Sequence, residues 1–120
     1  MKTSELKDLA LDWAAAKAMG VDVELNHGEV VAWKTVAFEE FRFVWKPSTS
    51  WLQGGAIIER ERITIDARQH GALWVAYSQR VNDDGITGNT PLIAAMRCFV
   101  ASKLGNEVDL PDEFKQGETA

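Results

Sequence analysis

Cysteine and histidine are scarce in this chain. Its 120 residues include one cysteine, Cys98, and two histidines. A single thiol excludes an internal disulfide and a cysteine-rich zinc site, and it is typical of proteins from a reducing compartment. His27 and His70 each lie beside a glycine in an expected turn, which favours solvated side chains over metal-binding or catalytic roles. We therefore expect no metal and no other cofactor.

Long apolar runs and an excess of positive charge are also absent. No segment reaches the roughly 18 apolar residues of a membrane-spanning helix, and the first residues contain no apolar signal core. The formal net charge is −5, which disfavours a general nucleic-acid binder because such proteins need a basic face. We expect a cytoplasmic protein without a membrane or nucleic-acid partner. The sequence leaves open whether the chain forms a homo-oligomer.

The chain length and the apolar pattern predict one α+β domain. Apolar residues spaced by three and four predict helices over residues 4–19 and 91–104. Ser4 and Thr90 are the expected N-caps, and Gly20 is the expected end of the first helix.

Alternating apolar and polar residues predict short strands, which are bounded by turn residues. The expected strands are 21–25, 29–33, 63–66, 73–77 and, more weakly, 41–45. We expect a mainly antiparallel sheet containing 21–25, 63–66 and 73–77, with both helices packed on one of its faces. Polar residues from 82 to 88 are expected to form a loop. Residues 106–120 are expected to form an acidic tail that is disordered towards its end.

The composition of residues 46–56, which we expect to form a loop, suits a small ligand. Hydroxyl groups donate to phosphate or sugar oxygens, and a tryptophan offers a flat face for a ring. Adjacent glycines let backbone N–H groups approach an anion closely. The expected ligand-binding residues are Ser48, Thr49, Ser50, Trp51, Gln53, Gly54 and Gly55, with Arg60 and Arg97 supplying positive charge.

A structural interpretation stands beside each of these expectations. The glycine pair is equally typical of a turn, and Trp51 of a side chain that fills the core. Arg97 can form an ion pair with Glu59 instead of contacting a ligand. Trp45 and Trp51 bracket the loop and are the tryptophans best placed for binding. No P-loop spacing or catalytic triad is visible, and Cys98 lies mid-helix near the apolar face. We therefore expect a protein that binds without catalysis.

Two long runs carry a family resemblance. They are residues 47–61 (PSTSWLQGGAIIERE) and 90–108 (TPLIAAMRCFVASKLGNEV), and residues 1–6 are similar as well. They resemble the NinX-like family of short tailed-phage and prophage proteins, a domain of unknown function. The chain departs from the family pattern at Ala56, where the family has Pro, and at Arg62, where it has Gly. The resemblance covers nearly the whole chain. It implies a phage origin and action in the cytoplasm of the infected bacterium, and it brings no catalytic residues.

Two functions are compatible with these observations. The first is a counter-defence protein that binds and sequesters a nucleotide-derived small molecule, using the ring, the hydroxyl groups and the cations around the loop. The second is an interaction module that docks on a host protein and inhibits it. In that case the acidic charge would mask a basic surface, and exposed Trp45 and Trp51 would supply the binding energy.

Overall fold

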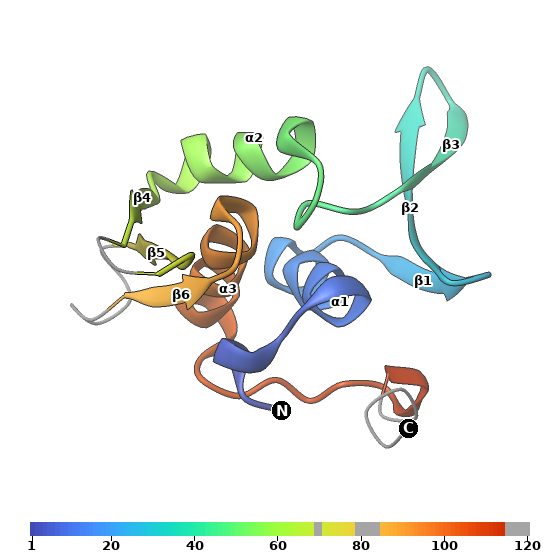
Figure 1. Ribbon diagram of the computed structural model, residues 1–120. Helices are drawn as coiled ribbons and strands as arrows, with labels where there is room; N and C mark the ends of the chain where they lie inside the picture. The colour runs from blue at the N-terminus through green and yellow to red at the C-terminus, as the bar shows by residue number, and fades with distance from the viewer. Residues whose placement is uncertain (69–70, 79–84, 115–120) are drawn as a thin grey trace.

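Helices and two small antiparallel sheets make up a computed structural model that describes residues 1–68, 71–78 and 85–114 (Figure 1). A short 3₁₀ turn, η1 (Thr3–Glu5), precedes the helices α1 (Asp8–Met19), α2 (Trp51–Glu61) and α3 (Pro91–Leu104). One sheet has the strand order β1 (Val23–Asn26), β2 (Glu29–Val36), β3 (Glu39–Val44). The other has the order β4 (Thr64–Ala67), β5 (Trp74–Tyr77), β6 (Ile86–Gly88). The predicted α+β class is confirmed.

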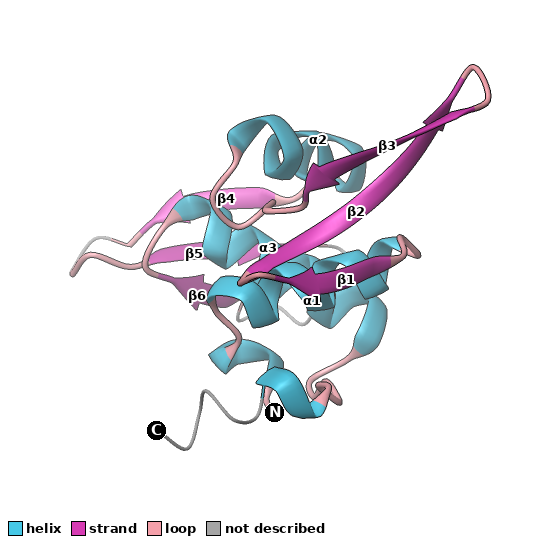
Figure 2. Ribbon diagram, turned by 90° about the vertical axis from the view of Figure 1, so that its right-hand side faces the viewer, coloured by secondary structure: helices cyan, strands magenta, loops and turns pink. Residues whose placement is uncertain are grey.

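The strands belong to two sheets, so the prediction of one shared sheet is wrong. The expected strand 21–25 contributes to the first sheet, whereas 63–66 and 73–77 contribute to the second. α3 packs on β4, β5 and β6, while α1 packs on α3 and on β2 (Figure 2). The two helices therefore lie between the sheets. Alternation along a strand shows which face is buried, but it does not show which strands pair.

The expected helix 4–19 is broken at Leu6. Ser4 lies in η1 instead of capping α1, and Lys7 precedes α1 without a side-chain cap. Leu6 is fully buried, and its carbonyl accepts a hydrogen bond from the Arg97 side chain. That carbonyl is therefore held by tertiary structure instead of by an intrahelical N–H. The predicted left-handed end at Gly20 is confirmed.

A helix, α2, occupies most of the segment that was expected to be a loop. The Ser50 side chain accepts a hydrogen bond from the Gln53 N–H at 3.3 Å and caps this helix. Gly54 is buried, and a Cβ there would meet the Pro47 carbonyl oxygen and lie 2.7 Å from Leu92 Cδ2. Gly54 therefore permits close packing of α2, and the alternative interpretation of the glycine pair as a turn is wrong.

The polar loop expected at 82–88 contains a strand. β6 pairs antiparallel with β5, which completes the second sheet. Residues 82–84 of this expected loop lie outside the described residues, as do 69–70, which include His70.

Part of the acidic tail packs into the core. Val108 and Leu110 are buried, and the Phe114 ring lies 5.9 Å from the Trp13 ring. The sequence did not predict this packing. Residues 115–120, where we expected disorder, lie outside the described residues.

A long hairpin projects from the body of the molecule (Figures 1 and 2). β2 pairs with β1 only as far as Ala32, but it pairs with β3 as far as Val36. Residues 33–42, which we call the arm, therefore form a two-stranded ribbon. The turn at its tip consists of Ala37 and Phe38, both with positive φ, and the Phe38 side chain is fully exposed.

Candidate functional site

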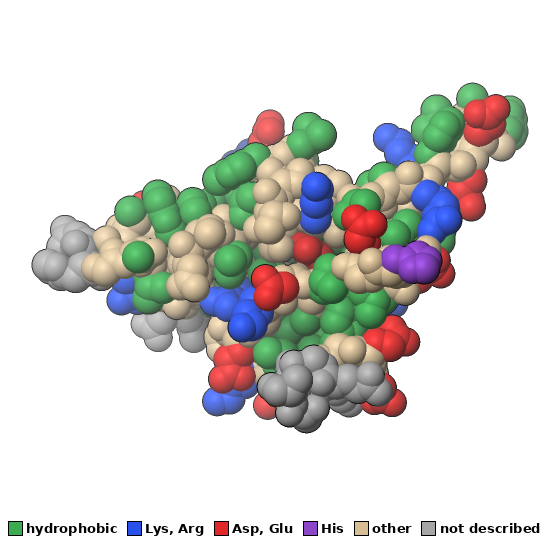
Figure 3. All heavy atoms as spheres, turned by 45° about the vertical axis from the view of Figure 1, so that its right-hand side comes forward, with side chains coloured by type: hydrophobic (Ala, Val, Ile, Leu, Met, Phe, Trp, Pro, Cys, Tyr) green, Lys and Arg blue, Asp and Glu red, His purple; other side chains and the backbone are tan. Residues whose placement is uncertain are grey.

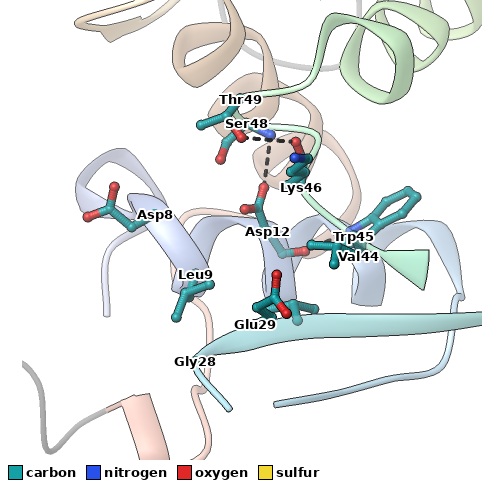
Figure 4. A pocket seen from close by; sticks show the side chains of 11 residues that line it. Asp8, Leu9, Asp12, Gly28, Glu29, Val44, Trp45, Lys46, Ser48 and Thr49 are labelled. Atoms are coloured by element: carbon teal, nitrogen blue, oxygen red, sulfur yellow. Dashed lines mark hydrogen bonds between the residues drawn. The ribbon is translucent and has the colours of Figure 1, made fainter. Parts of the chain in front are cut away.

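The loop between β3 and α2 separates two cavities. One has a volume of about 240 Å³ and lies between this loop and the start of α3. We call it the helix-start cavity, and its lining residues are Ser48, Thr49, Trp51, Thr90, Pro91, Leu92 and Ile93. The other has a volume of about 290 Å³ and lies between the loop, α1 and β2; we call it the α1 cavity (Figure 4). Ser48 and Thr49 line both.

The N-termini of two helices meet at the helix-start cavity. Trp51 is the first residue of α2 and Pro91 is the first residue of α3, and both line it. Aligned peptide dipoles place partial positive charge at each helix start. The Trp51 side chain is 58% exposed, so part of its ring is open to a ligand.

Backbone N–H groups at these two helix starts are available as donors. The Ser50 and Thr90 hydroxyl groups each accept the N–H three residues further on, at 3.3 and 3.1 Å. The N–H groups of Trp51, Leu52 and Leu92 have no acceptor among the described residues. Free N–H groups at a helix start bind anions such as phosphate. The helix-start cavity therefore has the chemistry of an anion site.

Ser48 holds a buried polar atom beside the cavities. The residue is 3% exposed, and its Oγ has no hydrogen-bond partner among the described residues. Its backbone N–H donates to Asp12 Oδ1 at 2.8 Å (Figure 4). The hydroxyl lies near enough to this carboxyl to favour its charged form, but not in hydrogen-bond geometry. An unpaired buried hydroxyl costs about 1–3 kcal/mol, which a ligand that pairs with it would recover.

The α1 cavity is acidic. Asp8, Asp12 and Glu29 line it together with Lys46. Asp12 is 4% exposed, and burial raises the pKa of its carboxyl from 3.8 to about 6, against the opposing hydrogen bond from Ser48. Such a lining disfavours an anion by charge repulsion. Of the two cavities, the helix-start cavity is the better phosphate site.

Three of the nine predicted ligand-binding residues line the helix-start cavity. They are Ser48, Thr49 and Trp51, and Ser50 adjoins them as the N-cap of α2. Gly54 and Gly55 lie in the first turns of α2, within the same chain segment, but line neither cavity. The hydroxyl and ring groups are thus brought together.

Gln53 contacts the end of β3 instead of a cavity. Its Oε1 accepts the Lys46 N–H at 2.7 Å, and its Nε2 donates to the Val44 carbonyl at 2.8 Å. The side-chain amide therefore takes the place of a neighbouring strand at this edge.

Arg60 lies away from both cavities. Its Nε is 3.1 Å from Glu61 Oε2, and its Nη2 contacts Met19 Sδ at 2.8 Å. Lys103 also approaches Glu61, at 3.2 Å. These contacts connect α2 to α1 and α3, so they give Arg60 a structural role.

Arg97 also contacts backbone groups far from the loop. Its Nε donates to the Leu6 carbonyl at 2.7 Å and its Nη1 to the Thr87 carbonyl at 2.9 Å. The alternative ion pair with Glu59 is not formed. Arg97 joins the N-terminal segment to β6 and lines neither cavity.

Two further differences concern residues that the sequence placed incorrectly or missed. Trp45 is 7% exposed and donates from Nε1 to the Asp12 carbonyl, so the prediction of an exposed Trp45 is wrong. Thr90, Pro91 and Leu92 line the helix-start cavity but were predicted only as a helix start. The capping pattern was therefore the signal for a second N-terminus that could bind an anion.

Comparison with known proteins agrees with the resemblance found in the sequence. No match was found among curated proteins. Within the described segments, no helix has the length and apolar character needed to cross a membrane. A protein-family model described as "Bacteriophage P22, NinX" matches residues 2–103, which is well over half of the chain. The chain therefore belongs to the NinX family of phage proteins.

Proposed function

We propose that this protein binds and sequesters a nucleotide-derived small molecule in the cytoplasm of the infected bacterium, as a counter-defence protein. The observation that carries the proposal is the meeting of two helix N-termini at one cavity that Trp51 also lines. Phosphate and a planar ring are the two groups that nucleotide-derived ligands share, and the cavity offers a partner for each.

The phosphate would be held by uncharged donors. Among the described residues, no acceptor pairs with the N–H groups of Trp51 and Leu92, which line the cavity, or with that of Leu52, the next residue of α2. Thr49 also lines the cavity, and its hydroxyl contacts the Lys46 carbonyl at only 3.4 Å. No lysine or arginine is among the residues that line it. Backbone N–H groups at helix starts bind phosphate in several nucleotide-binding motifs. Phosphate binding in this cavity therefore does not require Arg60 or Arg97, which lie elsewhere in the fold.

The ring would lie on Trp51 at the rim. At about 240 Å³ the cavity is smaller than the roughly 300–1,000 Å³ of pockets that enclose a drug-sized ligand. A phosphate with part of a sugar suits that volume, and the base then extends towards the exposed Trp51 ring. Stacking of a base on an aromatic side chain contributes about 1–3 kcal/mol.

The lining chemistry supports binding without turnover. The helix-start cavity is lined by serine, threonine, tryptophan, proline, leucine and isoleucine side chains. Hydroxyl nucleophiles need an adjacent base, and hydrolysis of a phosphate ester generally needs a metal or an acid and base. The Asp12 carboxyl beside Ser48 lines the α1 cavity and is not among the residues that line the helix-start cavity, so this lining favours capture over chemistry.

Isothermal titration calorimetry against cyclic dinucleotides and ADP-ribose derivatives tests the proposal. At least one member of the panel should bind, and Trp51→Ala should weaken its binding by about 5- to 150-fold, the equivalent of one lost stacking contact. Trp33→Ala, which alters a partly exposed tryptophan on the arm, is the matched control and should bind like wild type. A panel without any binder, or equal affinity for Trp51→Ala and wild type, would contradict the proposal.

The second candidate function is docking on a host protein, and the arm favours it. Phe38 at the tip is fully exposed, and it is followed by Glu39 and Glu40. Figure 3 shows hydrophobic and acidic side chains together at the end of the projecting hairpin. An apolar pocket bordered by basic residues would be the complementary surface. Capture of a host protein by wild type and not by Phe38→Ser would favour this candidate over the first.

A further inference from the structure

The outer edge of β3 is an open strand edge that can pair with another strand. β3 is the last strand of its sheet, and most of its side chains are exposed. An open strand edge is a template for pairing with another strand, and natural proteins usually block it.

The hydrogen bonds of β3 show which of its residues direct their backbone N–H and C=O groups away from β2. In the pairing with β2, the Trp45 N–H donates to Val30, so odd-numbered residues direct their backbone groups towards β2. Even-numbered residues direct theirs to the open edge. The Val44 carbonyl agrees with this, since it accepts from Gln53 on the outer side.

Gln53 closes only one end of this edge. Its amide pairs with Val44 and Lys46 at the base of the hairpin. The outward N–H and C=O groups of Glu40 and Arg42 have no partner within the described part of the chain. The open edge is therefore two outward residues long, and it lies on the arm.

We propose that β3 pairs antiparallel with β3 of a second copy of this chain, around a two-fold axis at Phe41. In this register Glu40 lies opposite Arg42 of the second copy, and Arg42 lies opposite its Glu40. Both residues direct their backbone N–H and C=O groups to the open edge, so each opposed pair exchanges two backbone hydrogen bonds. Each pair also joins opposite charges on the same face of the sheet. This inference is independent of the proposed ligand.

The neighbouring antiparallel registers are less favourable because they oppose like charges. A shift that keeps outward residues opposite one another places either Glu40 against Glu40 or Arg42 against Arg42 on the axis. A shift by a single residue opposes outward groups to inward groups and forms no ladder. The ion pair of Arg42 with Glu24 within one chain is 4.0 Å long and exposed, so it leaves Arg42 able to bind elsewhere.

The same register covers apolar side chains that are otherwise exposed. Phe41 is half exposed and would pack on Phe41 of the second copy, because the two form a close, non-hydrogen-bonded pair. The ladder ends with the two hydrogen-bonded pairs, because Gln53 occupies the edge at Val44. The turn residue Phe38 of the second copy would then lie at that end, near Gln53 and its chain neighbour Leu52, which is 88% exposed. Self-pairing thus explains the apolar arm without a host protein and weighs against the second candidate function.

Analytical ultracentrifugation of charge variants tests the pairing and its register. Wild type should be a concentration-dependent dimer, and Glu40→Arg should weaken dimerisation by about tenfold or more because like charges then oppose one another. The double variant Glu40→Arg with Arg42→Glu should restore it, since the opposed charges are again unlike. Glu39→Arg is the matched control, because it changes the net charge equally but faces Phe43 of the second copy.

A cysteine at the axis provides a second test. Phe41→Cys should form an intermolecular disulfide under mild oxidation, because this pair lies at disulfide distance. Phe43→Cys should not, since its two copies lie at least about 13 Å apart in this register. The native Cys98 is fully buried and does not compete. A monomer at millimolar concentration, or a dimer insensitive to Glu40→Arg, would overturn the proposal, as would equal crosslinking of the two cysteine variants.

Discussion

At the scale of single residues, short side chains of the loop lie near one another, whereas the two arginines expected to join them contact other parts of the fold. Ser48, Thr49 and Trp51, which are close in sequence, line one cavity. Arg60 and Arg97 reach across several residues to groups far away in sequence. A serine or threonine hydroxyl stays close to its own backbone, so its place follows from its position in the chain. An arginine side chain is long, so its partner depends on the tertiary fold.

Replacing Ser48 should change stability and ligand affinity in opposite directions. Ser48→Ala removes a buried hydroxyl that has no partner among the described residues, so it should raise the free energy of unfolding by about 0.5–2 kcal/mol. The same change removes a group that the ligand would pair with, so affinity should fall. Urea denaturation and calorimetry on one preparation measure both. A variant that loses stability without losing affinity would show that the hydroxyl is structural.

Asp12 should make stability depend on pH. Its pKa is about 6 in the folded chain against an ordinary 3.8, so the folded state binds the extra proton between these values. Stability contributed by Asp12 is then complete below about pH 3.8 and is lost as the pH rises to about 6. Asp12→Asn keeps an acceptor for the Ser48 N–H and does not titrate.

Urea unfolding at several pH values measures this dependence. Asp12→Asn should be more stable than wild type at pH 7.5 by roughly 1–3 kcal/mol, and this advantage should disappear near pH 4. A difference between the two proteins that stays constant with pH would show that Asp12 is not buried as a charged group.

At the scale of elements, strong local signals were reliable and mixed ones were not. Thr90 followed by Pro91 predicted the start of α3 correctly, because cap and proline chemistry act locally. The start of α2 was hidden because a glycine pair normally indicates a turn. Packing against Pro47 decides the conformation there, and packing cannot be inferred from local composition.

The two adjacent glycines of α2 should respond in opposite directions to alanine. Gly54→Ala should lower the free energy of unfolding by about 1–3 kcal/mol, because its Cβ would meet Pro47 and Leu92. Gly55→Ala should raise it by roughly 0.5–1 kcal/mol, because the nearest atom, Trp51 Cε3, is 4.0 Å away and alanine favours a helix. Thermal or urea unfolding measures both. Stabilisation by Gly54→Ala would contradict the observed contact of α2 with the loop.

At the scale of the whole molecule, the class was predictable and the arrangement was not. Alternation and helical periodicity gave the α+β class, but the division into two sheets depends on pairings between distant segments. The arm was missed because it turns at Ala37 and Phe38, which carry none of the usual glycine or asparagine turn signal. The convergence of two helix starts likewise exists only once α2 and α3 are packed together.

The net charge of −5 makes this convergence important for the proposed binding of an anionic ligand. An acidic protein repels an anionic ligand at long range, so any attraction has to be local. Partial positive charge from two helix starts, together with N–H groups that have no acceptor among the described residues, would provide such a local attraction, which overall composition does not reveal.

The most direct measurement is therefore a titration followed by NMR through the backbone amides. Labelled protein would be titrated with inorganic phosphate and then with ADP-ribose. Phosphate should shift the amide signals of Trp51, Leu52 and Leu92 most, and ADP-ribose should add a shift at the Trp51 indole. No shift at these amides, or larger shifts around Asp12 in the α1 cavity, would contradict the claim that two helix starts form the ligand site.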